Sequence, residues 1–188
     1  MPETYPPIDL ARLSLTEIAA LVADRRLPPV ESWNPARSGD SEMRIAADGS
    51  WYHQGGRIDR PAMVRLFATI LRREPDGGYV LVTPAEKLSI VVEDAPFVAV
   101  ELRTEGHGRD RQMAFRLNTD DIVVAGPDHR LRIEERDDGP HPYVGVRAGL
   151  DALIARPLYY ELIDLALEED ADPPGLWSAG GFFALDGR

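Results

Sequence analysis

The stretch LVTPAEKLSIVVEDAPF, residues Leu81 to Phe97, decides the organisation of this chain. It contains two short apolar runs joined by Pro-Ala-Glu-Lys, a pattern that is typical of two antiparallel strands with a turn between them. Beyond the second run, Pro96 interrupts the strand ladder, because proline lacks the N–H group that a central strand donates. We therefore predict a hairpin that ends at a boundary between two lobes, with the junction at Asp94-Ala95-Pro96.

Further short strands surround this stretch. Between Tyr79 and Ile133 the pattern has a period of two residues, and turns rich in Pro, Gly and Asp separate the runs. Strands in such close succession pair antiparallel, since parallel neighbours need long crossover connections. The expected strands are YVLVT, LSIVVE, FVAVELRT, QMAFRLNT, DIVVA and LRIEE, followed by PYVGVR.

Two helices and a hairpin are predicted on the N-terminal side. Ser14 and Glu17 have the spacing of a capping box and open the helix SLTEIAALVADR. The segment MRIAADGSWYHQ is predicted to form a hairpin with Asp48-Gly49 as its turn. In the helix RPAMVRLFATILRR, Pro61 occupies the first turn and Arg72-Arg73 complement the C-terminal dipole. Its predicted apolar face consists of Met63, Leu66, Phe67, Ile70 and Leu71.

The C-terminal half has a comparable order of elements. We predict a short helical stretch around Leu150 to Ile154, then the helix RPLYYELIDLALEED and the tail LWSAGGFFAL. RPAMVRLFATIL and RPLYYELIDLAL align without a gap, and each follows a hairpin and precedes a turn and a strand. Amphipathic helices that start at proline also resemble one another by chance, which is the alternative. If the repeat is real, the chain is an α+β protein of two small lobes, residues 1–95 and 96–188, with mostly antiparallel sheet.

Composition narrows the function classes. The chain has 188 residues and no cysteine, and the absence of cysteine excludes disulfides and thiolate sites. Its formal net charge of −11 opposes binding of a nucleic acid polymer. The N-terminus MPETYPPIDL lacks the basic and apolar regions of a signal peptide, and no apolar run is long enough to span a membrane. We therefore expect a cytoplasmic protein without membrane contact.

Standard catalytic and cofactor motifs are not found in the sequence. There is no GxxxxGK[ST] phosphate loop, no GxGxxG between a strand and a helix, and no GxSxG elbow. The histidines His53, His107, His129 and His141 show no i, i+4 pair and occur in or beside different turns. We predict no metal site and no catalytic residue, and we assign no cofactor.

The landmarks, taken in order, resemble an uncharacterised bacterial family, domain of unknown function 1285. The matching segments are PPVESWNP, MRIAADGSWYHQGGRIDRPAMVRLFATILRRE, DGGYVLVTPAEK, VEDAPFVAVE, LNTDD, PYVGVRAGLDALIARPLYYEL and LWSAGGFF. The resemblance covers about residues 28–183. It implies two lobes built from a repeated hairpin–helix–strand motif, a cleft between them, a nucleotide-like ligand and a role in signalling.

The candidate ligand-binding residues are those expected near the lobe junction. Charged and polar side chains border it, two tryptophans offer flat faces for a planar ligand, arginines suit a phosphate, and a serine lies in a glycine-rich segment. For each of them the alternative is a structural role, such as a solvated hairpin charge or a buried cap. The residues are Trp33, Arg65, Thr83, Glu86, Lys87, Asp94, Arg147, Trp177 and Ser178, with Arg44 as a further candidate for phosphate.

Three functions remain open from the sequence. The favoured hypothesis is a sensor that binds a small anionic or nucleotide-like ligand between the lobes. The second is an interaction module or oligomeric scaffold that binds no small ligand; a homo-oligomer is one form of it. The third is an enzyme that uses Glu86 or Asp94 as general base with Lys87 stabilising anionic charge.

Overall fold

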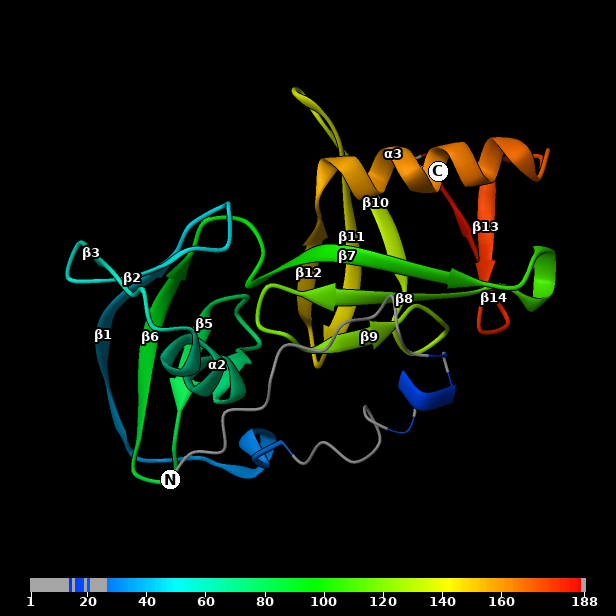
Figure 1. Ribbon diagram of the computed structural model, residues 1–188. Helices are drawn as coiled ribbons and strands as arrows, with labels where there is room; N and C mark the ends of the chain where they lie inside the picture. The colour runs from blue at the N-terminus through cyan, green and yellow to red at the C-terminus, as the bar shows by residue number, and fades with distance from the viewer. Residues whose placement is uncertain (1–13, 15, 19, 21–26, 187–188) are drawn as a thin grey trace.

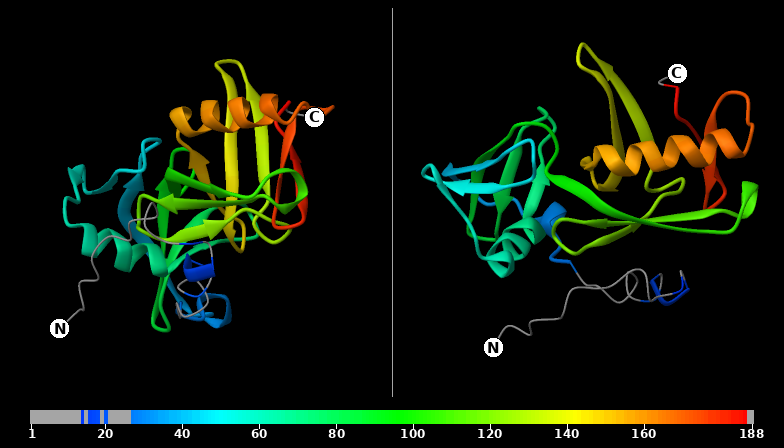
Figure 2. Two further views of the ribbon diagram at one scale, coloured as in Figure 1. Left: turned by 45° about the vertical axis from the view of Figure 1, so that its right-hand side comes forward. Right: turned by 45° about the horizontal axis from the view of Figure 1, so that its top comes forward.

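The computed structural model describes residues 14, 16–18, 20 and 27–186, which form two lobes, each around a six-stranded sheet (Figures 1 and 2). The N-terminal sheet has the order β3-β2-β1-β6-β5-β4. Its elements, with a 3-10 turn η2 ahead of them, are η2 (Val30–Ser32), β1 (Arg37–Ile45), β2 (Trp51–His53), β3 (Gly56–Arg57), α2 (Pro61–Thr69), β4 (Leu71–Arg73), β5 (Tyr79–Val82) and β6 (Glu86–Val92).

The C-terminal sheet has the order β10-β11-β12-β7-β8-β9, and a separate hairpin, β13–β14, follows the long helix α3. In Figure 1 α3 crosses this lobe, and β13 and β14 lie at its end away from the N-terminal lobe. The elements are β7 (Phe97–Glu105), η3 (Gly108–Asp110), β8 (Gln112–Leu117), β9 (Ile122–Val124), β10 (Leu131–Arg136), β11 (Gly139–Arg147), β12 (Leu150–Ile154), α3 (Arg156–Glu168), β13 (Gly175–Ser178) and β14 (Gly181–Ala184).

Both sheets share one strand topology. In each sheet the first strand lies beside the last in parallel, β1 with β6 and β7 with β12, and antiparallel pairs flank this centre. The predicted α+β class with two lobes and mostly antiparallel sheet is confirmed. The order hairpin, helix, strand does occur twice, but α2 connects the two halves of its sheet whereas α3 follows the last strand of its own. The two helices that align in sequence therefore occupy different places in the fold.

Two local predictions are wrong. Residues Leu150–Ile154 form strand β12 rather than a helix, because pairing with β7 and β11 buries alternate side chains. Arg72 and Arg73 belong to β4 and not to the end of α2, which stops at Thr69. On α2 the predicted apolar face is also only partly buried, since Leu66 is 62% exposed.

The predicted N-terminal cap is confirmed where the structure describes it. The Ser14 N–H donates to Glu17 Oε2 at 2.8 Å and the Glu17 N–H donates to Ser14 Oγ at 3.3 Å, which is the reciprocal arrangement of a capping box. Ile18 is fully buried against Ala114 and Ile122 of the C-terminal sheet. The other residues of this predicted helix, apart from 16 and 20, lie outside the described residues.

One hydrophobic core continues through both lobes. Ile45, Trp51 and Leu71 of the N-terminal lobe belong to the same buried cluster as Phe97 and Phe115 of the C-terminal lobe. The lobes are therefore packed on each other rather than joined only by a linker. Across the described ranges, no helix has the length and apolar content needed to cross a membrane.

Candidate functional site

The charges of the opening hairpin are engaged within their own lobe. Thr83 Oγ1 accepts the N–H groups of Ala85 and Glu86 at 3.3 and 3.2 Å and closes the turn between β5 and β6. Glu86 lies 3.5 Å from Arg37 on the neighbouring strand β1. Both of these predicted ligand residues thus interact with other residues of the N-terminal lobe.

Lys87, the only lysine, forms part of a polar cluster under η2. Its Nζ donates to Glu74 at 3.0 Å, and Arg72 donates to the same carboxylate at 2.7 Å. Arg72 also donates to the Trp33 carbonyl at 2.7 Å, so Arg72 and Glu74 together link two predicted site residues, Trp33 and Lys87. Burial alone would raise the pKa of Glu74, but the hydrogen bonds from Lys87 and Arg72 outweigh it and lower that pKa.

Asp94 faces the C-terminal lobe. The Tyr143 hydroxyl donates to Asp94 Oδ1 at 2.6 Å, Arg136 donates to it at 3.0 Å, and His141 lies 4.0 Å from the other oxygen. Burial, and then the Asp94 carboxylate, raise the pKa of the Tyr143 hydroxyl. The cluster ties the connection between β6 and β7 to β10 and β11.

Arg65 and Arg147 hold α2 against the C-terminal lobe. Arg65 Nη1 lies 2.8 Å from Asp120 in the turn between β8 and β9. Arg147, from β11, donates to the Ala68 carbonyl near the end of α2, and its guanidinium lies 5.4 Å from the Phe97 ring. Both arginines are therefore at the lobe junction, and both have protein partners there. Arg44 pairs with Glu93 within the N-terminal lobe.

Trp177 and Ser178 lie elsewhere, on β13 at the far end of the C-terminal lobe (Figure 1). The buried Ser178 hydroxyl accepts the Met113 N–H at 2.9 Å and donates to the Ala125 carbonyl at 2.7 Å. The Trp177 ring contacts Phe182 and the Arg109 guanidinium, with separations of 5.4 and 4.9 Å. The two predicted tryptophans, Trp33 and Trp177, thus belong to different lobes.

A pocket of about 300 Å³ opens where the two lobes meet, and we call it the junction pocket. Most of its wall comes from the N-terminal lobe: the β1–β2 turn, the segment before α2 and α2 itself. The β8–β9 turn of the other lobe completes the wall. Its lining residues are Asp48, Gly49, Ser50, Trp51, Arg57, Ile58, Asp59, Pro61, Val64 and Asn118.

Asn118 joins the lobes at this pocket. Its Oδ1 accepts the Val98 N–H at 3.0 Å, and its Nδ2 donates to the Gly49 carbonyl at 3.3 Å. Gly49 has a φ of +83°, and a Cβ there would lie 2.6 Å from Asn118 Nδ2 and 2.9 Å from Val98 Cγ2. The predicted Asp48-Gly49 turn therefore needs glycine both for its backbone conformation and for its contact with the other lobe.

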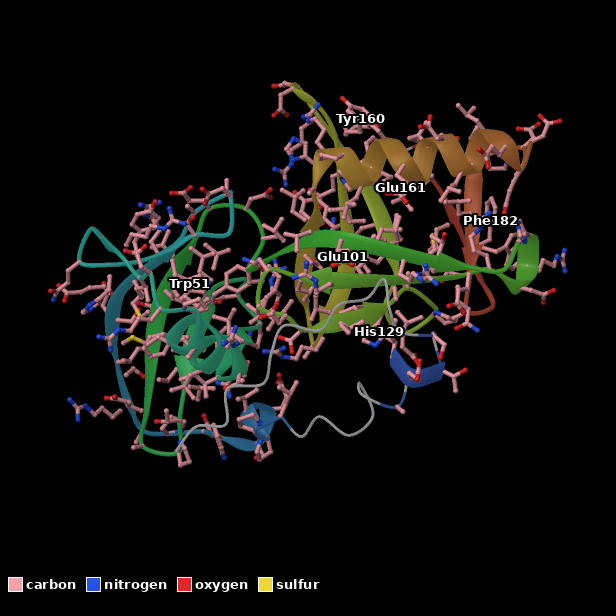
Figure 3. The ribbon with its side chains drawn as sticks, in the orientation of Figure 1. Trp51, Glu101, His129, Tyr160, Glu161 and Phe182 are labelled. Atoms are coloured by element: carbon pink, nitrogen blue, oxygen red, sulfur yellow. The ribbon has the colours of Figure 1, made fainter. Side chains whose placement is uncertain are left out.

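Trp51 provides a wall of the pocket with an unused donor. The side chain is only 1% exposed and stacks on Phe67 of α2, with ring centroids 6.3 Å apart. Figure 3 labels it beside α2 in the N-terminal lobe. Its indole Nε1–H is buried and has no hydrogen-bond acceptor among the residues that the structure describes. The nitrogen itself has almost no exposed surface, so this donor does not open onto the pocket.

The charges of the junction pocket are mixed. Asp48 Oδ1 accepts the Ser50 N–H at 2.9 Å, and this backbone hydrogen bond is the main cause that lowers the pKa of Asp48. Arg57 lies 3.4 Å from Asp59. The lining therefore presents two carboxylates and one guanidinium. In the described ranges no group of three or more metal-ligating side chains comes together, here or elsewhere.

Sequence reasoning missed the key residues of this pocket. Trp51 and Asn118 were not candidates, although the Asp48-Gly49 turn and the segment LNTDD, which contains Asn118, were both noted. None of the nine predicted ligand residues lines the junction pocket, but Arg65 is the neighbour of the lining residue Val64. Ligand binding by these nine residues stays a prediction.

Comparisons with known proteins agree on one family. The family model described as "Domain of unknown function (DUF1285), N-terminal domain" matches residues 28–95, and "Protein of unknown function (DUF1285), C-terminal domain" matches residues 96–185. A crystal structure of a DUF1285 family protein from Silicibacter pomeroyi DSS-3 is similar at 46% identity, with a TM-score of 0.78 over 92% of this chain and 94% of that one.

A second solved structure is more distant. The DUF1285 family protein from Shewanella baltica OS155 shares 26% identity, with a TM-score of 0.51 over 65% of this chain and 90% of that one. No curated protein matches the chain.

Proposed function

The chain belongs to the DUF1285 family, and from that premise we propose that it binds a nucleoside or nucleoside monophosphate in the junction pocket. The observation that carries this proposal is a pocket of about 300 Å³ shared by both lobes, whose wall holds the Trp51 side chain, the Asn118 amide and two carboxylates.

The lining chemistry suits a nucleoside. The carboxylates of Asp48 and Asp59 can accept the hydroxyl groups of a ribose, as acidic side chains do in dinucleotide sites. The Asn118 amide keeps one donor and one acceptor position beyond its two hydrogen bonds, and these suit the edge of a base. Binding pockets have volumes of about 300–1,000 Å³, and this pocket lies at the lower end of that range.

The number of phosphates is limited by charge. Among the described lining residues, Arg57 is the one that supplies a guanidinium, and it is already 3.4 Å from Asp59. Two carboxylates against one cation oppose a polyphosphate, since like charges at close range are unfavourable. We therefore favour a neutral nucleoside or a monophosphate over a triphosphate.

Occupation of this pocket is expected to act on both lobes. A ligand there contacts Asn118 of the C-terminal lobe together with the β1–β2 turn of the N-terminal lobe. Such a ligand favours the arrangement of the lobes in which both contacts are made. This supports a sensor role, in which the arrangement of the lobes reports the ligand.

Calorimetric titration with the four ribonucleosides and their 5′-monophosphates tests the proposal. Asp48→Asn removes the charge but keeps the acceptor for the Ser50 N–H, and we expect it to weaken binding about tenfold, as loss of a charge-assisted hydrogen bond does. Asp76→Asn is the matched control, because Asp76 accepts the Gly78 N–H at the same 2.9 Å in a similar turn outside the pocket. Equal affinities of the two variants, or no binding to the wild type, would reject the proposal.

A second candidate is an oligomeric scaffold. Tyr160 and Leu167 lie seven residues apart on α3, hence on one face, and are 56% and 66% exposed. The ion pairs of Arg65, Lys87 and Asp94 inside the chain also agree with a protein that needs no small ligand. Light scattering after size exclusion tests this function: a dimer that Leu167→Glu dissociates supports it, and a monomer at all concentrations rejects it.

A further inference from the structure

We propose a second binding site, in a pocket on the N-terminal lobe, for a small amphipathic anion with an aromatic or acyl body and one carboxylate. The pocket has a volume of about 450 Å³, larger than the junction pocket. It is called here the methionine pocket, and its lining residues are Met43, His53, Gly56, Arg57, Ile58, Asp59, Arg60, Met63 and Phe67.

The floor of the methionine pocket is apolar. Met43 is buried, Ile58 and Phe67 pack partly buried against the main core, and Met63 stands at the rim with 42% of its surface exposed. Methionine side chains adapt to irregular apolar partners and make favourable contacts with aromatic rings. This floor therefore suits the flat or aliphatic body of a small molecule, whose burial removes apolar surface from water.

The rim is cationic in a protein that is strongly acidic overall. The two guanidinium groups of Arg57 and Arg60 lie in the lining beside the His53 ring, and Asp59 is the one acidic side chain among the described lining residues. Arg57 is close to Asp59, whereas the side chains of Arg60 and His53 have no partner among the described residues. A local cationic rim attracts an anion even when the net charge of −11 does not.

The combination selects the ligand class. An uncharged apolar molecule makes no ion pair with the exposed Arg60 guanidinium, and an inorganic anion leaves the floor of Met43 and Phe67 uncovered. A carboxylate on an apolar body satisfies both, because guanidinium groups bind carboxylates with two parallel hydrogen bonds. The site is separate from the proposed nucleoside site, although the two pockets share the segment 57–59 as a wall.

Titration with 2-naphthoate and with its neutral analogue 2-naphthamide tests the inference. We expect saturable binding of one naphthoate per chain, and about tenfold weaker binding of the amide, which cannot pair with the guanidinium. Arg60→Gln is expected to remove most of this preference for the anion. Equal affinities for the two probes, or no saturable binding of naphthoate, would overturn the inference.

A pair of variants on α2 locates the site. Met63→Glu places a carboxylate in the pocket and is expected to weaken naphthoate binding at least about tenfold through repulsion of like charge. Leu66→Glu is the matched control, because Leu66 is 62% exposed on the same helix and outside the lining. Both positions tolerate a helix-forming charged residue. Equal loss of binding in the two variants would show that naphthoate binds elsewhere, whereas nucleoside binding is expected to stay unchanged in both.

Discussion

The contact between the lobes at Gly49 gives a sharp test of the architecture. Gly49→Ala adds one methyl group at a φ of +83°, 2.6 Å from Asn118 Nδ2 and 2.9 Å from Val98 Cγ2. A left-handed conformation destabilises an L-residue by about 1–2 kcal/mol, and one extra methyl group in a tight contact destabilises by about 1–3 kcal/mol. We therefore expect Gly49→Ala to lower the free energy of unfolding by about 2–5 kcal/mol.

Gly77 supplies a matched control within the same lobe. Its turn has the same hydrogen bonds as that of Gly49: in each the glycine N–H bonds to the carbonyl three residues earlier at 2.9 Å. The φ of Gly77 is +88°, but the nearest atom to an added Cβ is Arg73 Nη2 at 3.9 Å. Gly77→Ala therefore carries only the backbone strain, about 1–2 kcal/mol.

Urea unfolding of the two variants at 25 °C separates these contributions. The excess loss in Gly49→Ala over Gly77→Ala measures the contact between the β1–β2 turn and the other lobe, and we expect about 1–3 kcal/mol. In a thermal scan each kcal/mol corresponds to about 2–4 °C for a chain of this size. Equal losses in the two variants would refute the reasoning, since they would mean that Asn118 and Val98 yield to the methyl group at no cost.

Three further outcomes follow from buried or junction groups. Ser178→Ala leaves the Met113 N–H and the Ala125 carbonyl without their partner. We therefore expect the free energy of unfolding in urea to fall by about 1–3 kcal/mol. A fall below about 0.5 kcal/mol would contradict the structural role of the serine. The folded state lowers the pKa of Glu74, so this carboxylate stabilises the protein above its unfolded pKa of about 4.3, and the contribution disappears as the pH falls through the folded pKa. The stability difference between wild type and Glu74→Gln should thus be full at pH 7 and shrink below about pH 4.3, and a difference independent of pH would refute this. A double-mutant cycle of Arg65→Met and Asp120→Asn, both partly exposed, should give a coupling of about 0.5–1 kcal/mol, whereas zero coupling would show that this ion pair does not help to hold the lobes together.

Strand content was predictable because apolar alternation and turn residues are local signals. The hairpin at Asp48-Gly49 and the strands between Tyr79 and Ile133 formed as predicted. The error at Leu150–Ile154 has a physical cause: a run of five residues without clear alternation has no distinctive period, and it became a strand through pairing with the distant strand β7. The parallel centres of both sheets likewise depend on pairing between strands far apart in sequence, which spacing does not reveal.

The candidate site was less predictable than the fold. Asn118 and Gly49 are 69 positions apart, and only the packing of the lobes brings them together. Lys87 stood out as the only lysine, yet its position beside Glu74 and Arg72 gives it a role within the N-terminal lobe. A missing hydrogen bond, such as that of the Trp51 indole, is a property of the folded environment and leaves no pattern in the sequence.

The most direct test of the junction site observes the Trp51 indole itself. The chain has three tryptophans, so ¹⁵N-labelled protein gives three indole N–H signals, and Trp51→Phe identifies the one from the pocket wall. During titration with a nucleoside monophosphate we expect the Trp51 signal to shift, because this side chain forms part of the pocket wall, while the signals of Trp33 and Trp177 stay in place. A saturating ligand that leaves the Trp51 signal unmoved, or that moves only the signal of Trp177, would contradict binding at the lobe junction.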